Sequence, residues 1–319
     1  MTTQPGAAAD PIRRLDPALR ELAPARTNLA PERLAAVRAS LNARRRDSAE
    51  TLEASGVDIA DGSAPAEDGR SIPVRIYRGG ARRAPAVIFC HSGAFVLGNL
   101  DTDHRQCVEL ARRAGCTVVS VDYRLAPEHP HPAAFDDALA VLKWVAAEAD
   151  SLDVDGSRLA VAGTSAGGAL AALLAQSAAT GAAPSVVFQL LHQPVLDDAE
   201  TPSKQEFATT PGFDGPATRQ MWNHLGGSGP LGMAAVPAHC RKLTGLPNAM
   251  ITCSELDPLR DEAVDYALRL LRAGVPTELH VFAGTCHGFD SLSPDWEVTQ
   301  QLFALQGAAL RRAWRPAAD

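Results

Sequence analysis

Residues 158–172 read RLAVAGTSAGGALAA, an apolar run followed by small residues that surround one serine, Ser165. The pattern predicts a buried strand, a sharp turn and then a helix. Its GTSAG core fits the G-x-S-x-G nucleophile elbow, which holds a serine hydroxyl exposed above a parallel sheet. Gly163 and Gly167 stand where a Cβ would collide as strand and helix approach each other. An ordinary glycine-rich turn can have the same sequence, so the rest of the chain must decide between the two interpretations.

Apolar runs alternate with helical patterns on both sides of this stretch. Strands that alternate with helices of ten or more residues predict parallel pairing through right-handed crossovers, so we expect an α/β fold. The predicted strands are 72–77, 86–90, 117–121, 158–162, 185–192, 249–253 and 277–282. The predicted helices are 31–45, 101–114, 133–149, 166–179, 216–225, 261–273 and 296–312. Residues 60–71 are polar, contain glycine and proline, and are expected to form a loop.

Composition excludes several classes of protein. With 319 residues, 46% hydrophobic and 21% charged, the chain is close to the globular average. Its net charge of −7 argues against nucleic acid as a partner, because nucleic-acid-binding proteins usually carry a basic footprint. The start, MTTQPGAAAD, lacks the features of a secretory signal, and no apolar run approaches the roughly 20 residues of a membrane span. We therefore expect a cytoplasmic protein with no membrane partner.

Two later segments supply the groups that a catalytic serine needs. A serine hydroxyl is a poor nucleophile until a base takes its proton, and the base needs an acid to fix its tautomer. In α/β-hydrolases the order is serine, acid, histidine, each at the end of a strand. His287 lies in the loop after the last predicted strand and before a glycine. Spacing alone does not choose among the acids after strand 249–253, which are Glu255, Asp257, Asp261 and Glu262.

A loop after an early strand occupies the place of an oxyanion-stabilising loop. Acyl transfer needs N–H donors for the developing oxyanion, and one is usually the backbone N–H after the nucleophile, here that of Ala166. The other donors are expected from HSGAF, residues 91–95, which directly follow strand 86–90.

Residues 86–289 resemble the hormone-sensitive-lipase-like family of α/β-hydrolases, a group of bacterial carboxylesterases. DYRLAPEHP at 122–130 matches the family signature almost letter for letter. GTSAGG at 163–168 resembles the branch with threonine before the nucleophile, DPLRDEA at 257–263 the acid segment, and HGF at 287–289 the histidine segment. The resemblance implies an α/β-hydrolase fold, with a mostly parallel central sheet flanked by helices and covered by a helical cap.

The resemblance also assigns roles to residues. It implies that Ser165 is the nucleophile, Asp257 the orienting acid, and His287 the general base. The oxyanion hole that it implies consists of the N–H groups of Gly93, Ala94 and Ala166.

The sequence departs from the family pattern at three places. The family loop reads H-G-G-G, so Ser92 and Ala94 replace glycines and the loop has less freedom to adopt positive φ. Ala94 can still donate its N–H equally well if its φ is negative. Ala169 stands where many relatives have Asn, and the pair at 192–193, His-Gln, stands where many have an Ile-Tyr-like pair. For Ala169 and the pair at 192–193 two interpretations stay open: the substitutions reshape the pocket, or they have little effect.

The resemblance further suggests how the chain is divided. Residues 1–50 are expected to supply N-terminal cap helices, and residues 51–319 to form the catalytic domain with a cap insertion at about 197–245. The residues expected to line an acyl pocket under this cap are Phe95, Met221 and Trp222. The alternative is that these three side chains are plain core between cap and sheet.

The leading hypothesis is a serine carboxylesterase that hydrolyses short- to medium-chain acyl esters through an acyl-enzyme intermediate. The same triad would serve an amidase or deacetylase, or a lactone or ester hydrolase of specialised metabolism. A non-catalytic ligand-binding member of the fold is a third alternative, against which the three filled triad positions speak. We expect no cofactor and no metal, a small-molecule acyl ester as partner, and a homodimer by analogy with relatives.

Overall fold

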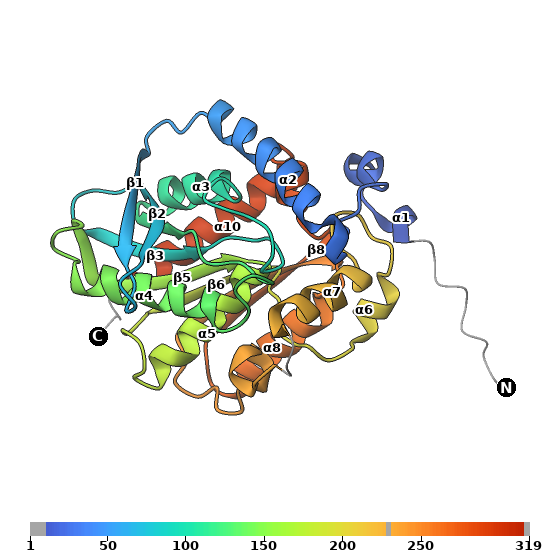
Figure 1. Ribbon diagram of the computed structural model, residues 1–319. Coiled ribbons are helices and arrows are strands. Elements are labelled where there is room, and N and C mark those ends of the chain that lie inside the picture. Colours follow the sequence, from blue (N-terminus) through green and yellow to red (C-terminus); the bar gives the residue numbers. More distant parts are fainter. Residues whose placement is uncertain (1–10, 228–230, 316–319) are drawn as a thin grey trace.

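The structure is a computed structural model that describes residues 11–227 and 231–315 (Figure 1). Parts of the predicted regions lie outside the described residues: 1–10 of the N-terminal cap, 228–230 of the insertion and 316–319 of the catalytic domain. Among the described helices, none combines the length and apolar character needed to cross a bilayer.

The described residues form one eight-stranded sheet. Its strands are β1 (Asp58–Pro65), β2 (Ser71–Arg78), β3 (Ala84–Cys90), β4 (Thr117–Val121), β5 (Val154–Thr164), β6 (Phe188–His192), β7 (Asn248–Leu256) and β8 (Thr277–Cys286). They lie in the order β1-β2-β4-β3-β5-β6-β7-β8. The pairs from β4 to β8 are parallel, whereas β2 runs antiparallel to both β1 and β4. The predicted mostly parallel sheet is therefore confirmed.

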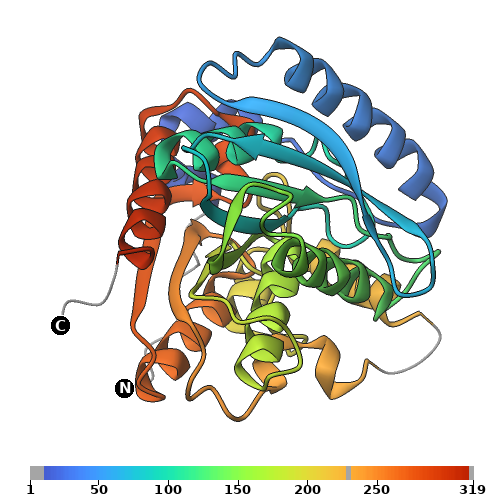
Figure 2. The ribbon, with the colours of Figure 1, turned by 90° about the vertical axis from the view of Figure 1, so that its left-hand side faces the viewer.

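Helices cover both faces of the sheet (Figures 1 and 2). One face carries α3 (His104–Ala114) and α10 (Glu297–Ala313), and the other carries α4 (Ala133–Ala147), α5 (Ala166–Ala179) and α8 (Arg260–Arg272). Because side chains alternate along a strand, Val87 and Phe89 of β3 enter the first layer, while Ile88 enters the second. Burial on both faces explains why β3 reads as a continuous apolar run.

Strand β1 corrects the prediction that residues 60–71 form a loop. It pairs with β2 over its whole length, from Asp58 opposite Arg78 to Pro65 opposite Ser71. Most of its side chains are exposed, so the segment lacks the alternation of apolar residues that marks a strand in sequence. Backbone pairing with β2 makes it a strand. The other predicted strands and helices are present, with ends displaced by a few residues.

The N-terminal segment contacts the insertion. The N-terminal helices are α1 (Pro11–Arg14), η1 (Pro17–Leu22) and α2 (Pro31–Thr51). The insertion contains α6 (Pro202–Glu206), α7 (Gly215–Gly226), η2 (Met233–Ala235) and η3 (Pro237–His239), and α9 (Phe289–Leu292) follows β8. The Leu29 N–H donates to Gln220 Oε1 at 2.9 Å, and the Leu29 carbonyl oxygen lies 2.7 Å from His224 Nε2. The division into a cap and a catalytic domain stays a prediction, which these contacts support.

Candidate active site

Ser165 occupies the turn between β5 and α5 with φ of 56° and ψ of −118°. Positive φ is strained for a residue with a side chain, and such strain persists only where the surroundings impose it. Here two glycines allow the strand and helix to come together. A Cβ on Gly163 would lie 2.1 Å from the Gly167 carbonyl oxygen, and one on Gly167 would lie 1.9 Å from the Cys90 carbonyl oxygen. The predicted steric reason for both glycines is confirmed.

The three predicted triad side chains meet at the carboxyl ends of β5, β7 and β8. His287 Nε2 lies 3.0 Å from Ser165 Oγ, and His287 Nδ1 lies 2.8 Å from Asp257 Oδ2. The other Asp257 oxygen accepts the N–H of Leu259 at 2.8 Å, which fixes the carboxylate. All three side chains are buried. Hydrogen bonds between residues 30 and 122 positions apart thus join the three side chains, because parallel strands end at the same edge of the sheet.

Of the four acids left open by spacing, the structure places only Asp257 beside His287. Glu255 turns to the other side of the strand end, where it accepts Arg14 Nη2 at 2.8 Å and a backbone N–H of β8 at 2.8 Å. Asp261 and Glu262 lie in the first turn of α8, where they accept the backbone N–H groups of Ser203 at 2.8 Å and Leu196 at 2.7 Å. The acid that lies beside His287 is therefore the one that the family resemblance implies.

The charges around His287 favour its protonated form. Burial acts to lower the pKa of His287, but the charge and hydrogen bond of Asp257 outweigh it, so the pKa lies above its usual value. The neighbouring thiol of Cys286 is buried, and burial raises its pKa to about 12. Cys286 is therefore protonated at neutral pH and lacks the thiolate that a nucleophilic cysteine needs.

The loop after β3 faces Ser165 with its backbone in an unusual conformation. Gly93 has φ of 131°, and a Cβ there would lie 2.1 Å from the Leu97 carbonyl oxygen. Ala94 has φ of 54° and Phe95 has φ of 60°. The sequence predicts that Ala94 donates equally well if its φ is negative. In the structure φ is positive, because the loop turns tightly. The described residues offer no acceptor to the N–H groups of Gly93 and Ala94.

Side chains hold this loop from two sides. The Ser92 backbone N–H donates to Asp103 at 2.6 Å and the Ser92 hydroxyl donates to the same carboxylate at 3.1 Å. The Tyr123 hydroxyl, from the DYRLAPEHP segment, donates to the His91 carbonyl oxygen at 2.7 Å, and its ring stacks on that of His91. Ser92, which replaces a family glycine, therefore holds the loop through its hydroxyl as well as its backbone. Tyr123 of the family signature holds the loop through the hydrogen bond to His91.

Arg38 of α2 fastens the N-terminal helix to the same loop. Its guanidinium donates to the carbonyl oxygens of Val96 at 2.6 Å and Ala126 at 2.8 Å, and it also binds both carboxylate oxygens of Glu128. This interaction lowers the pKa of Glu128 to about 2. Bidentate guanidinium–carboxylate pairs are geometrically specific, so Arg38 sets where α2 lies over the site.

We expect Ala94→Gly to change kcat by no more than about threefold. The alanine already adopts the left-handed backbone conformation that glycine would adopt, at a local cost of roughly 1–2 kcal/mol, so the substitution removes strain without moving the N–H. The measurement is steady-state hydrolysis of a p-nitrophenyl ester beside the thermal midpoint of the variant. A gain in kcat of tenfold or more would contradict this result and show that the alanine distorts the loop.

The cavity beside Ser165 has a volume of about 380 Å³. It does not include the predicted pocket residues, which are buried in the core between α7 and the sheet. Those residues are Phe95, Met221 and Trp222. The rings of Phe95 and Trp222 pack against each other with centroids 6.3 Å apart. For this cavity the pocket prediction is wrong, and large apolar side chains have instead filled the interior, as the alternative interpretation stated.

Other parts of the chain supply the cavity walls. Helix α2 contributes Leu41, Arg45 and Ser48. The first two lie in the helix predicted over 31–45, and Ser48 lies in the part of α2 that extends beyond that prediction. The loop between α6 and α7 contributes Phe213, whose ring centroid lies 5.1 Å from that of His287. Sequence reasoning missed Phe213 because nothing in an irregular insertion indicates which side chain turns toward a distant histidine.

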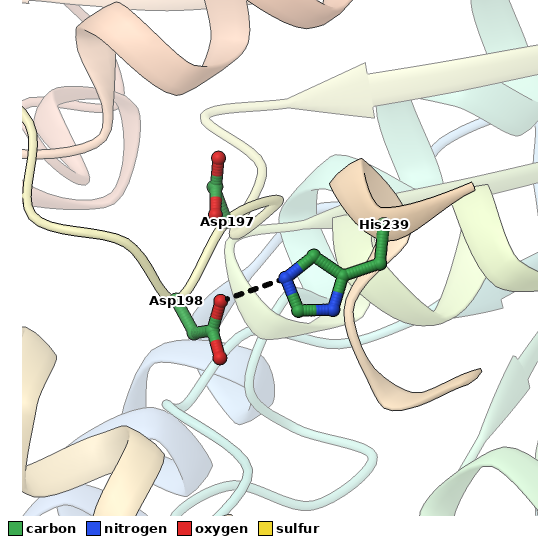
Figure 3. A group of neighbouring side chains, drawn as sticks. All are labelled: Asp197, Asp198 and His239. Atoms are coloured by element: carbon green, nitrogen blue, oxygen red, sulfur yellow. Dashed lines mark ion pairs between the residues drawn. The ribbon is translucent and has the colours of Figure 1, made fainter. Parts of the chain in front are cut away.

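A group of Asp197, Asp198 and His239 brings three potential metal ligands within 4.8 Å of one another (Figure 3). His239 Nε2, the nitrogen nearer the carboxylates, already pairs with Asp198 at 3.0 Å (Figure 3). Asp197 and His239 are half-buried, and Asp198 is exposed. The contact between His239 and Asp198 accounts for this arrangement, and we assign it no part in the site.

Comparisons with known proteins show the family to which the fold belongs. Residues 87–291 match the family described as alpha/beta hydrolase fold. The crystal structure of esterase LipW from Mycobacterium marinum is 56% identical, covers 98% of this chain and 99% of its own, and superposes with a TM-score of 0.94. A bacterial heroin esterase is 37% identical over 96% of this chain and 99% of its own, with a TM-score of 0.89. Carboxylesterase NlhH of Mycobacterium tuberculosis is 39% identical over 76% of this chain and 78% of its own.

Fold and site together define an α/β-hydrolase. The chain belongs to the hormone-sensitive-lipase-like family of these enzymes, as its DYRLAPEHP segment indicated. It is a carboxylic ester hydrolase of that family.

Proposed function

We propose that Ser165 is the nucleophile, His287 the general base and Asp257 the acid that orients it. The observation that carries this proposal is the unbroken chain of hydrogen bonds from Ser165 Oγ through His287 to Asp257. Such a chain removes the serine proton and stabilises the imidazolium that results. Burial of all three side chains keeps water from competing for these hydrogen bonds.

In the first half of the reaction, His287 Nε2 takes the proton as Ser165 Oγ attacks the ester carbonyl carbon. The tetrahedral intermediate then loses its alcohol oxygen, which departs with that proton and leaves the acyl group on Ser165. In the second half, His287 takes a proton from water, and the hydroxide attacks the acyl-enzyme. The carboxylic acid leaves, and the proton returns to Ser165 Oγ.

We propose that the oxyanion hole consists of the N–H groups of Gly93, Ala94 and Ala166. The first two lack acceptors among the described residues, and Ala166 opens α5, where the N–H groups of a first helical turn have no partner within the helix. Donors fixed in advance at the point where negative charge develops are the largest single contribution in many acyl transfers. The anchors at Ser92 and Tyr123 keep this loop in place before substrate binds.

The proposed substrates are short- to medium-chain acyl esters. A cavity of about 380 Å³ is at the small end of the range for ligand sites, roughly 300 to 1,000 Å³. Its walls mix the apolar Leu41 and Phe213 with charged groups, and this mixture suits a compact ester better than a long hydrocarbon chain.

Three measurements test the proposal. An organophosphate should add its mass to the peptide that contains Ser165, and p-nitrophenyl butyrate should be hydrolysed. A panel of p-nitrophenyl esters of increasing acyl length, with anilides and lactones beside them, should give the highest kcat/KM for short and medium esters. Modification at another residue, or turnover that survives complete modification of Ser165, would contradict the assignment. Faster cleavage of anilides or lactones would favour the alternative substrate classes.

We also propose a cytoplasmic homodimer. The large apolar side chains exposed among the described residues, Leu268, Leu271 and Val281, all lie on α8 or on the edge strand β8. An exposed strand edge with apolar neighbours favours pairing with another copy. Sedimentation equilibrium of the purified chain distinguishes this dimer from a monomer.

A further inference from the structure

Residues 192–195, which begin with the last residue of β6, bind the backbone of the nucleophile. The Ser165 N–H donates to the His192 carbonyl oxygen at 2.8 Å, and the Val195 N–H donates to the Ser165 carbonyl oxygen at 3.0 Å. Both backbone groups of the serine are therefore held by this one segment. The segment also begins with the His-Gln pair that departs from the family pattern.

The side chain of Gln193 reaches from this segment to the loop that carries His287. Its Oε1 accepts the N–H of Gly288 at 2.7 Å, and its Nε2 lies 3.4 Å from the carbonyl oxygen of Cys286. Nε2 also donates to Ser254 Oγ at 2.7 Å, and Ser254 Oγ donates to the same Cys286 carbonyl oxygen at 3.0 Å. One amide thus grips the backbone on both sides of His287.

The backbone at Gln193 has an unusual conformation that its neighbours hold in place. Its φ is 45°, its N–H donates to the Thr252 carbonyl oxygen at 2.6 Å, and its side chain is fully buried. Positive φ in a non-glycine residue is held only by its surroundings, and here it turns the side chain toward the histidine loop. Beside it, His192 Nε2 lies 3.2 Å from Asp290 Oδ1, a second link between the segment and the residues after His287.

We infer that Gln193 is a positioning residue that sets the distance between Ser165 Oγ and His287 Nε2. The segment binds the backbone of Ser165 through its own backbone, and it binds the backbone beside His287 through the Gln193 amide. Both reacting residues are therefore held in place by the same segment. Gln193 touches neither reacting atom. A primary amide suits this role because it is at once an acceptor for Gly288 and a donor for Cys286 and Ser254. The inference rests on the proposed triad.

The test compares Gln193→Met, one residue beyond the end of β6, with a matched variant inside that strand, Gln189→Met. Gln189 is also fully buried, and its Nε2 donates to the Pro247 carbonyl oxygen at 3.0 Å at the opposite end of β6. Both substitutions remove a buried amide, so both should lower the thermal midpoint. Only Gln193→Met should lower kcat, by about 10- to 100-fold with KM within about threefold, because misplacement of a reacting group by roughly 1 Å costs up to 10²-fold.

A second pair of variants keeps the inference testable if the methionine variants do not fold. Gln193→Glu keeps the acceptor for Gly288 and loses the amide donor, and Gln189→Glu is its control. We expect lower kcat only at position 193. We also expect the acid limb of the kcat/KM profile to move to higher pH, because a carboxylate beside His287 favours the imidazolium form. Equal kcat in the 193 and 189 variants, or a loss expressed only in KM, would overturn the inference.

The outcome is separable from that of the proposed function. Wild-type protein that hydrolyses esters and is modified at Ser165, with kcat indifferent to Gln193, would overturn only the positioning role. Wild-type protein that is not modified at Ser165 would overturn the triad itself.

Discussion

Asp257→Asn is expected to lower kcat by about 10⁴-fold. The carboxylate accepts His287 Nδ1–H at 2.8 Å and so leaves Nε2 free to take the serine proton. An asparagine amide can donate to Nδ1 instead, which places the proton on Nε2 and removes the base. The loss should appear in kcat on p-nitrophenyl butyrate, with circular dichroism unchanged.

Glu255→Gln is the matched control, since Glu255 lies two residues away at the same strand end. Its partners are Arg14 and a backbone N–H of β8, so the substitution should change kcat by less than about threefold while it lowers stability modestly. A large loss of kcat in Glu255→Gln, with near-normal kcat in Asp257→Asn, would reverse the assignment of the acid.

Lys204→Met is expected to lower the free energy of unfolding by about 3–5 kcal/mol. Lys204 of α6 and Glu262 of α8 form a buried ion pair with Nζ and Oε2 2.6 Å apart, and each residue is only 3% exposed. Removal of the ammonium leaves a carboxylate without its counter-charge in the interior. Urea unfolding at pH 8 measures this loss. The control is Lys143→Met, whose ion pair with Glu67 is equally short but exposed, and it should cost at most about 1 kcal/mol.

The loss in Lys204→Met should depend on pH. Burial raises the pKa of Glu262 from 4.5 to about 7 even with Lys204 present, and without the lysine it should rise further. For an acid whose folded pKa lies above its unfolded value, the destabilisation is absent below the unfolded pKa and grows as pH rises through the folded one. The deficit should therefore be smaller at pH 5 than at pH 8. An equal deficit at both pH values would show that lost packing, rather than the unpaired charge, is responsible.

The predictions from sequence succeeded where local sterics and strand ends decide the outcome. Gly163 and Gly167 are required by the close approach of strand and helix. The sharp turn at Ser165 could therefore be predicted from a few residues on either side of it. Residues at the ends of parallel strands must share one edge of the sheet, so Ser165 and His287 could be expected to meet.

The predictions failed where a distant part of the chain decides. Strand β1 lacks an apolar pattern and exists through its pairing with β2, and Ala94 takes positive φ because the loop around it closes tightly. Phe95 and Trp222 are buried against each other in the core, while Phe213 reaches His287 from the insertion. These outcomes depend on which side chains fill the interior best, and that is a property of the whole packed molecule.

By itself, the sequence determined the class of fold and the order of the serine, acid and histidine of the proposed triad along the strands, because glycine sterics and strand periodicity act over a few residues. The tertiary structure alone decided which side chains line the cavity beside Ser165, how the loop after β3 bends, and how Gln193 connects the segment that binds Ser165 with the loop that carries His287. The physical reason is the range of the interactions. Hydrogen bonds between residues about a hundred positions apart form only when the sheet has brought their strand ends together.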